Sequence, residues 1–282
     1  MLDALRESLP QLGLPQRPGI SQSEDYRRAV LHGLPLAANN RDERPVLRAP
    51  EQLRLEIAEH FAVTLPVLRT PDREDFLLLV RALAHRSEPI AISAGVHAQA
   101  IGGLIHWGLI RAYGRETRAR LILLHEAPYG SVPADQVPGQ PSAADWLARS
   151  GALRLEHELT HLATKALCGE MRLNLLDELI ADAMGMLRAL GTFSAELFRR
   201  CLGVDEDGSA PAEARVWTYT TELEQSDAIA AVRLVLERAR ELEWLFQAKQ
   251  LPADPVQRLV WLCRQRIDRS WTCANATLTQ GM

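Results

Sequence analysis

The chain has 282 residues, of which 47% are hydrophobic, and this is enough apolar material for one large domain or two smaller ones. The formal net charge is −4, and acidic and basic residues alternate without a basic patch or arm. We therefore do not expect nucleic acid to be a principal partner.

The first half of the chain has mostly helical patterns. Prolines make residues 1–20 irregular. Capping signals and apolar spacing then indicate three helices, over residues 21–31, 51–61 and 71–86. In the second of these, Leu53, Ile57 and Phe61 would lie on one helix face.

The next stretch, Ile90–Ile110, is largely apolar and long enough to cross a bilayer. It contains His97, Gln99 and His106, with two consecutive glycines in its middle. These polar and helix-weakening residues make a membrane span unlikely, and we interpret the stretch as a buried helix.

A short apolar run at residues 120–125 is the best candidate for a strand. Residues 127–142 are rich in proline and are expected to form a loop that leads directly into a long helix. This loop could equally form the rim of an active site or simply connect two elements. After this region the patterns are helical again, with helices expected over residues 194–202, 211–224, 226–250 and 254–269. The fold class predicted from these elements is mainly α, or α+β with a small β component.

The long helix that begins after Ser142 contains the motif His-Glu-x-x-His at residues 157–161. His157 and His161 lie one turn apart on the same helix face. Two imidazoles so placed can bind one zinc ion, and Glu158 lies beside them as a candidate general base.

A second helix can supply a third ligand. Gly169 can end the first helix and Asn174 can cap the next. His161 then lies roughly 10 Å before the end of the first helix, and Glu178 roughly 6 Å inside the second. A short antiparallel hairpin would therefore bring these side chains together at a single site.

Asp177 competes with Glu178 for the ligand role. Glu178 and Asp182 share a helix face, whereas Asp177 is turned away from it, so we prefer Glu178. Both helices are apolar on more than one face, and charged groups in such helices need a partner or a metal.

This arrangement, His-Glu-x-x-His followed by a helix with Glu-x-x-x-Asp, resembles the gluzincin branch of the zincin metallopeptidases. The resemblance covers about residues 142–187 and implies a zincin-like pair of active-site helices, and the residue patterns place this pair within a largely helical body. It implies that His157, His161 and Glu178 bind zinc and that Glu158 activates the attacking water. Asp182 would hydrogen-bond a ligand histidine.

Three protein ligands leave a fourth position open on zinc, which is the catalytic pattern. The sequence therefore predicts a zinc hydrolase, and a peptide or a small amide is the expected substrate. A donor for the developing oxyanion is also needed, and Tyr129, Tyr219 and His125 are candidates by residue type alone.

Two other functions stay open. Glu158-x-x-His161 is also the motif of di-iron carboxylate proteins, although a second copy is absent. A non-catalytic, zincin-like binding module is the other alternative, which the intact Glu158 disfavours. A second metal site at His97 and His106 is conceivable, but satisfied buried histidines are commoner.

No pair of cysteines has Cys-x-x-Cys spacing, so the four thiols are expected to be buried residues rather than disulfides or zinc ligands. Residues 1–16 lack the apolar core of a signal peptide, which indicates a cytoplasmic protein. We expect one catalytic domain over residues 1–282, with a subdivision at residues 1–114, 115–191 and 192–282.

Overall fold

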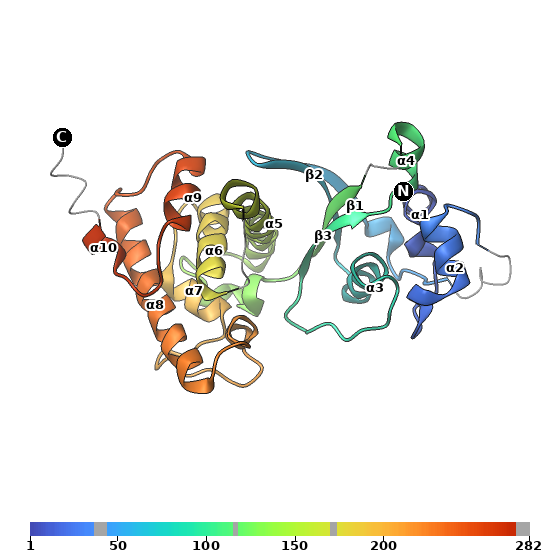
Figure 1. Ribbon diagram of the computed structural model, residues 1–282. Coiled ribbons are helices and arrows are strands. Elements are labelled where there is room, and N and C mark those ends of the chain that lie inside the picture. The colour runs from blue at the N-terminus through green and yellow to red at the C-terminus, as the bar shows by residue number, and fades with distance from the viewer. Residues whose placement is uncertain (37–43, 115–117, 170–173, 275–282) are drawn as a thin grey trace. The chain divides into compact units, whose positions relative to one another are not determined.

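The computed structural model describes residues 1–36, 44–114, 118–169 and 174–274 (Figure 1). It is mainly helical with one small sheet, which confirms the predicted fold class. Its contacts divide the chain into two compact units, Met1–Glu59 with Thr64–Glu126, and His60–Val63 with Ala127–Met282. The predicted subdivision had boundaries at residues 114 and 191 instead.

The first unit contains a four-stranded sheet with the strand order β1-β2-β4-β3. The strands are β1 (Arg54–His60), β2 (Val63–Thr70), β3 (Ala98–Leu104) and β4 (Ala119–His125). Strands β2 and β4 are parallel, whereas β3 and β4 are antiparallel. The predicted strand at 120–125 is confirmed, and its residues 121–124 are all apolar because β4 pairs on both edges and this part of it is buried.

The helices of the first unit are short, apart from α3 (Arg73–Ala84). The others are α1 (Leu2–Ser8), α2 (Glu24–Tyr26), which continues as a π turn through Leu31, and α4 (Trp107–Tyr113). The predicted helix at 71–86 is confirmed as α3, where Phe76, Leu79 and Val80 pack in one cluster with Leu121 and Leu123 of β4.

Two predicted helices of the first unit are wrong. The segment 51–61 is mostly strand β1, in which Ile57 and Phe61 are 61% and 41% exposed and only Leu53 of the supposed face is buried. The stretch Ile90–Ile110 forms β3 and the start of α4, separated by a turn in which His106 caps α4. Within the described residues, no helix is long and apolar enough to cross a membrane.

In the second unit, a loop with two 3₁₀ turns, Tyr129–Ser131 and Ala134–Gln136, leads into a series of helices. Its helices are α5 (Ala143–Cys168), α6 (Leu175–Leu190), α7 (Ala195–Cys201), α8 (Gln225–Gln247), α9 (Pro255–Cys263) and α10 (Trp271–Ala274). The predicted helices at 194–202 and 226–250 are confirmed, and that at 254–269 is confirmed as far as Cys263. The one at 211–224 is wrong, because this segment forms only a 3₁₀ turn at Arg215–Tyr219.

Helices α5 and α6 lie side by side in this unit (Figure 1). Leu153 on α5 and Leu179, Ala183 and Met186 on α6 are fully buried in one large apolar cluster. At Gly185 the two backbones approach closely, because a Cβ atom there would lie 2.8 Å from the carbonyl oxygen of Leu153. The absence of a side chain at this position therefore sets the spacing of the helix pair.

Candidate metal centre

The helix that carries the two histidines begins and ends at the predicted residues. The Ser142 hydroxyl accepts a hydrogen bond of 3.1 Å from the backbone N–H of Asp145, and this caps the start of α5. Gly169 ends the helix with a φ of 81°, which glycine adopts without strain. His157 and His161, one turn apart, are both buried.

The facing helix α6 is capped by Asn174, whose side-chain oxygen accepts hydrogen bonds from the backbone N–H groups of Leu176 and Asp177. Glu178 and Asp182 are buried and lie one turn apart. Asp177 is half-buried and lies outside the buried cluster of metal-binding side chains. The structure therefore brings Glu178 rather than Asp177 to the histidines.

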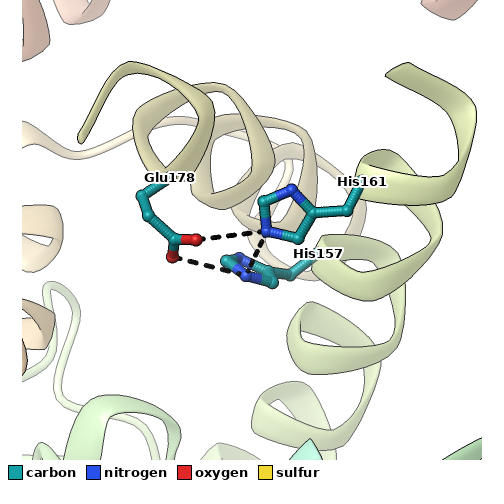
Figure 2. A group of neighbouring side chains, drawn as sticks. All are labelled: His157, His161 and Glu178. Atoms are coloured by element: carbon teal, nitrogen blue, oxygen red, sulfur yellow. Dashed lines mark hydrogen bonds and ion pairs between the residues drawn. The ribbon is translucent and has the colours of Figure 1, made fainter. Parts of the chain in front are cut away.

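Figure 2 shows the resulting cluster of His157, His161 and Glu178. The Nε2 atoms of the two histidines are 3.0 Å apart. Glu178 Oε1 lies 3.2 Å from His161 Nε2, and Glu178 Oε2 lies 3.5 Å from His157 Nε2. Two ring nitrogens and a carboxylate thus converge from two helices on one point.

These distances suit a tetrahedral metal. Zinc–nitrogen and zinc–oxygen bonds of about 2.0–2.1 Å place two tetrahedral ligand atoms roughly 3.3–3.4 Å apart. The separation of the two Nε2 atoms, 3.0 Å, and that of His161 Nε2 from Glu178 Oε1, 3.2 Å, are close to this value, and the other carboxylate oxygen lies 3.5 Å from His157 Nε2. The donor set, two imidazoles and one carboxylate, is also one that zinc accepts at catalytic sites.

His157 is held in a single orientation by groups on its other nitrogen. Its Nδ1–H donates a hydrogen bond of 2.7 Å to Asp182 Oδ1, which leaves the lone pair of Nε2 directed at the cluster. The hydroxyl of Tyr129 lies 3.0 Å from the same Nδ1 and donates to Asp182 Oδ1. Burial raises the pKa of Tyr129 well above its usual value, so the phenol keeps the proton that it donates.

Arg215 is a site residue that sequence reasoning missed. Its guanidinium donates a hydrogen bond of 2.7 Å to Glu178 Oε2 and lies 3.8 Å from Asp182 Oδ2. Its Nε donates to the Tyr219 hydroxyl at 2.7 Å. One cation therefore interacts with both buried carboxylates of α6. In the sequence, the spacing of four residues between Arg215 and Tyr219 was the only feature that could have suggested a contact of Arg215 with a site residue.

The charges of the cluster are strongly coupled. Burial alone would raise the pKa of Glu178, but the electrostatic interaction with His157, the hydrogen bond from His161 and the charge of Arg215 hold it well below its usual value. Burial opposes protonation of His161, yet the hydrogen bond and the charge of Glu178 outweigh this effect and raise the pKa of His161. Glu178 is therefore an anion that attracts a cation to the two imidazoles.

Glu158 lies beside the cluster on α5 and is half-exposed, unlike the buried ligand set. Its carboxylate is close enough for its charge to favour protonation of His161. A partly solvated carboxylate next to the ligands can exchange a proton with water, which a general base requires.

The three oxyanion candidates have different surroundings. Tyr129 contacts the Nδ1 side of His157, and this position favours a role in orienting that ring. Tyr219 is joined to the ligand Glu178 through Arg215. His125 belongs to the first unit, where its Nδ1 lies 2.8 Å from Nδ1 of His97 and its Nε2 lies 3.2 Å from the Pro71 carbonyl oxygen.

The second metal site considered at His97 and His106 is not formed. His97 precedes strand β3, and the His106 ring accepts a hydrogen bond from the backbone N–H of Leu109 at the start of α4. These histidines do not share a helix, because the predicted helix is replaced by a strand and a turn. In the described part of the chain, His157, His161 and Glu178 form the one group of three or more clustered metal-binding side chains.

The comparisons with known proteins identify a family but no activity. The model of a family of unknown function, DUF7005, matches residues 1–119 and 114–269. The chain therefore belongs to this family. No curated protein and no solved structure matches the chain.

Proposed function

We propose, from the site rather than from the family, that this chain is a zinc-dependent hydrolase that acts on a peptide or a small amide. The observation that carries the proposal is the convergence of His157 Nε2, His161 Nε2 and the Glu178 carboxylate, whose potential ligand atoms all lie within 4.8 Å of one another. Three protein ligands with a free fourth position are typical of catalytic rather than structural zinc. The resemblance of the motif to gluzincins supports the same reaction class.

A zinc ion at this site would polarise a substrate carbonyl and lower the pKa of an attacking water from about 16 to about 7. Glu158 would take the proton of that water and deliver it to the leaving amine. Asp182 and Tyr129 keep the Nε2 lone pair of His157 directed at the ion. Arg215 holds Glu178 in place and balances its charge.

We place this activity in the cytoplasm. The three described cysteines are free thiols, as is usual in a reducing compartment.

Metal content is the first test. The purified full-length chain should contain one zinc ion per chain by elemental analysis, and His161→Ala should lose it because two ligands bind the ion far more weakly. Asp177→Asn is the matched control, since Asp177 lies next to Glu178 but outside the cluster, and it should keep the zinc. A folded wild-type protein without metal, even after incubation with excess zinc, would refute the proposal.

Activity is the second test. The wild-type protein is incubated with a mixed peptide library and a set of N-acyl amino acid amides, and products are identified by mass spectrometry. Glu158→Gln should keep the zinc and reduce hydrolysis by at least about 10²-fold, because the general base is lost. If wild type and Glu158→Gln both bind zinc and neither hydrolyses any member of either set, the chain is a binding module.

The same metal analysis separates this proposal from the di-iron alternative. A di-iron site needs a second carboxylate and histidine set. The described residues contain a single cluster of three or more potential ligands, which favours one ion. Two iron ions per chain would favour the iron enzyme instead.

A further inference from the structure

Two cysteine thiols lie side by side at the ends of two packed helices of the second unit. Cys168 is the last residue of α5 and Cys263 the last residue of α9, the two helices are in contact, and the two thiols are close enough to interact electrostatically. Thr164, one turn before Cys168, places its hydroxyl 3.8 Å from Cys263 Sγ. Since residues four apart share a helix face, this second contact independently places Cys263 on the face of α5 that carries Cys168.

The two thiols differ in solvent exposure, which suits a reaction in which one thiol reacts before the other. Cys168 is exposed, which corrects the expectation that the cysteines are buried, and Cys263 is half-buried behind it. Cys201 is fully buried in the apolar core of the second unit, as expected. A small reagent in solution can therefore reach Cys168 first, and Cys263 is the thiol placed to react next.

We infer that Cys168 and Cys263 form a redox-active pair that a low-molecular-weight disulfide, such as glutathione disulfide, converts to an intrachain disulfide. The pair belongs to neither the ligand cluster nor its supporting residues, and the inference does not depend on zinc binding or hydrolysis.

The reaction is two thiol–disulfide exchanges. The Cys168 thiolate attacks one sulfur of glutathione disulfide, so that a mixed disulfide forms and one glutathione leaves. Cys263 then loses its proton to solvent and attacks Cys168 Sγ, which forms the intrachain bond and releases the second glutathione. In sum, two protein thiols are oxidised and one glutathione disulfide is reduced to two thiols.

The second exchange should be the slower one. Burial, followed by the negative charge of a neighbouring Cys168 thiolate, raises the pKa of Cys263 to about 12. The mixed disulfide removes the Cys168 charge, whereas burial still raises the pKa of Cys263, so Cys263 becomes easier to deprotonate after the first exchange. The mixed disulfide at Cys168 should accordingly accumulate before the cross-link forms.

The cross-link would join the end of α5 to the end of α9 and close a loop that contains α6, α7 and α8. Such a long closed loop restricts the unfolded chain strongly. We expect the oxidised protein to show a thermal unfolding midpoint higher by on the order of 5 °C.

The test uses full-length Cys273→Ser protein, so that three cysteines remain and each cross-link can be assigned. The protein is incubated with glutathione disulfide near neutral pH, samples are alkylated over time, and peptides are mapped without reduction. We expect a transient glutathione adduct at Cys168 and then a Cys168–Cys263 peptide pair that dithiothreitol removes.

Further substitutions in this background make the result specific. Cys263→Ser should stop at a stable glutathione adduct on Cys168, and Cys201→Ser should form the same cross-link at the same rate. A stable adduct at Cys168 without any Cys168–Cys263 cross-link in the parent protein would overturn the inference. A cross-link between Cys168 and Cys201 would overturn it as well.

Discussion

At the residue scale, Asp182 determines which nitrogen of His157 faces the cluster. Its Oδ1 accepts hydrogen bonds from His157 Nδ1–H and from the Tyr129 hydroxyl, and Asp182 is fully buried. The residue would thus act on a bound metal through His157 rather than by direct contact.

We predict that Asp182→Asn weakens zinc affinity by about 10–100-fold while the fold is kept. The amide can still accept from His157, but it lacks the charge that strengthens the ligand. Affinity is measured by competition with a chromogenic chelator, and Asp177→Asn is the control with unchanged affinity. Equal affinities of Asp182→Asn and wild type would contradict the assigned role.

Arg215 has a different task, because it contacts both carboxylates of α6 directly. Arg215→Gln removes the guanidinium that pairs with both Glu178 and Asp182. We predict that it destabilises the metal-free protein by roughly 3 kcal/mol, since breaking a buried ion pair leaves uncompensated charge. Zinc should restore part of this loss, as the ion also neutralises Glu178.

Urea unfolding with and without zinc measures the Arg215→Gln effect. Arg215→Lys, which keeps the charge but loses the paired hydrogen bonds, should be intermediate. An equal loss of stability in the zinc-loaded and metal-free forms would mean that Arg215 acts only through packing.

At the element scale, the helix pair was predictable because its signals are local. Ser142, Gly169 and Asn174 mark helix ends through contacts within a few residues, and the spacing of one turn fixes which side chains share a face. The positions of Glu178 and Asp182 relative to the histidines followed from these two rules. None of this required knowledge of the rest of the fold.

The strands were not predictable in the same way. Strand β2 pairs with β4, which lies far along the chain from it. The alternation of polar and apolar residues in β1 and β2, at 54–57 and 63–67, covers only four or five residues, and so short a run does not separate a strand from a helix. The spacing of Leu53, Ile57 and Phe61 imitates a helix although two of the three are exposed. Arg215 was missed for a related reason, because it reaches Glu178 across 37 residues from a 3₁₀ turn.

Gly185 tests how the two helices define the site. Alanine normally stabilises a helix by up to about 1 kcal/mol relative to glycine. At Gly185, however, the added Cβ would lie 2.8 Å from the Leu153 carbonyl oxygen, and backbone cannot move aside as a side-chain tip can. We predict that Gly185→Ala destabilises the protein by roughly 1–3 kcal/mol and weakens zinc affinity, because α5 and α6 are forced apart.

Chemical unfolding and chelator competition measure the two effects of Gly185→Ala. The control is Gly95→Ala, since a Cβ at Gly95 would have no atom within 4 Å. A Gly185→Ala protein as stable as wild type, with unchanged zinc affinity, would show that the spacing of the helices is not critical.

At the scale of the whole molecule, the ligands and their supporting residues are concentrated in one unit. The second unit contains all of the following: Tyr129, His157, Glu158, His161, Glu178, Asp182 and Arg215. The first unit has its own apolar core, centred on α3 and β4. Zinc binding should consequently stabilise the second unit directly and the first unit only through any coupling between them.

We predict two thermal transitions, of which only one responds to metal. Zinc at about 1,000 times its dissociation constant stabilises the folded state by about 4 kcal/mol, and a chelator should remove that contribution from the second unit alone. Tryptophan fluorescence identifies this unit, because Trp107 is the single tryptophan of the first unit and the other five lie in the second. Calorimetry should therefore show one shifted and one unshifted transition, with fluorescence following the shifted one. The His161→Ala protein should show no response to the chelator, whereas a metal-dependent shift that remains in this variant would place the ion elsewhere.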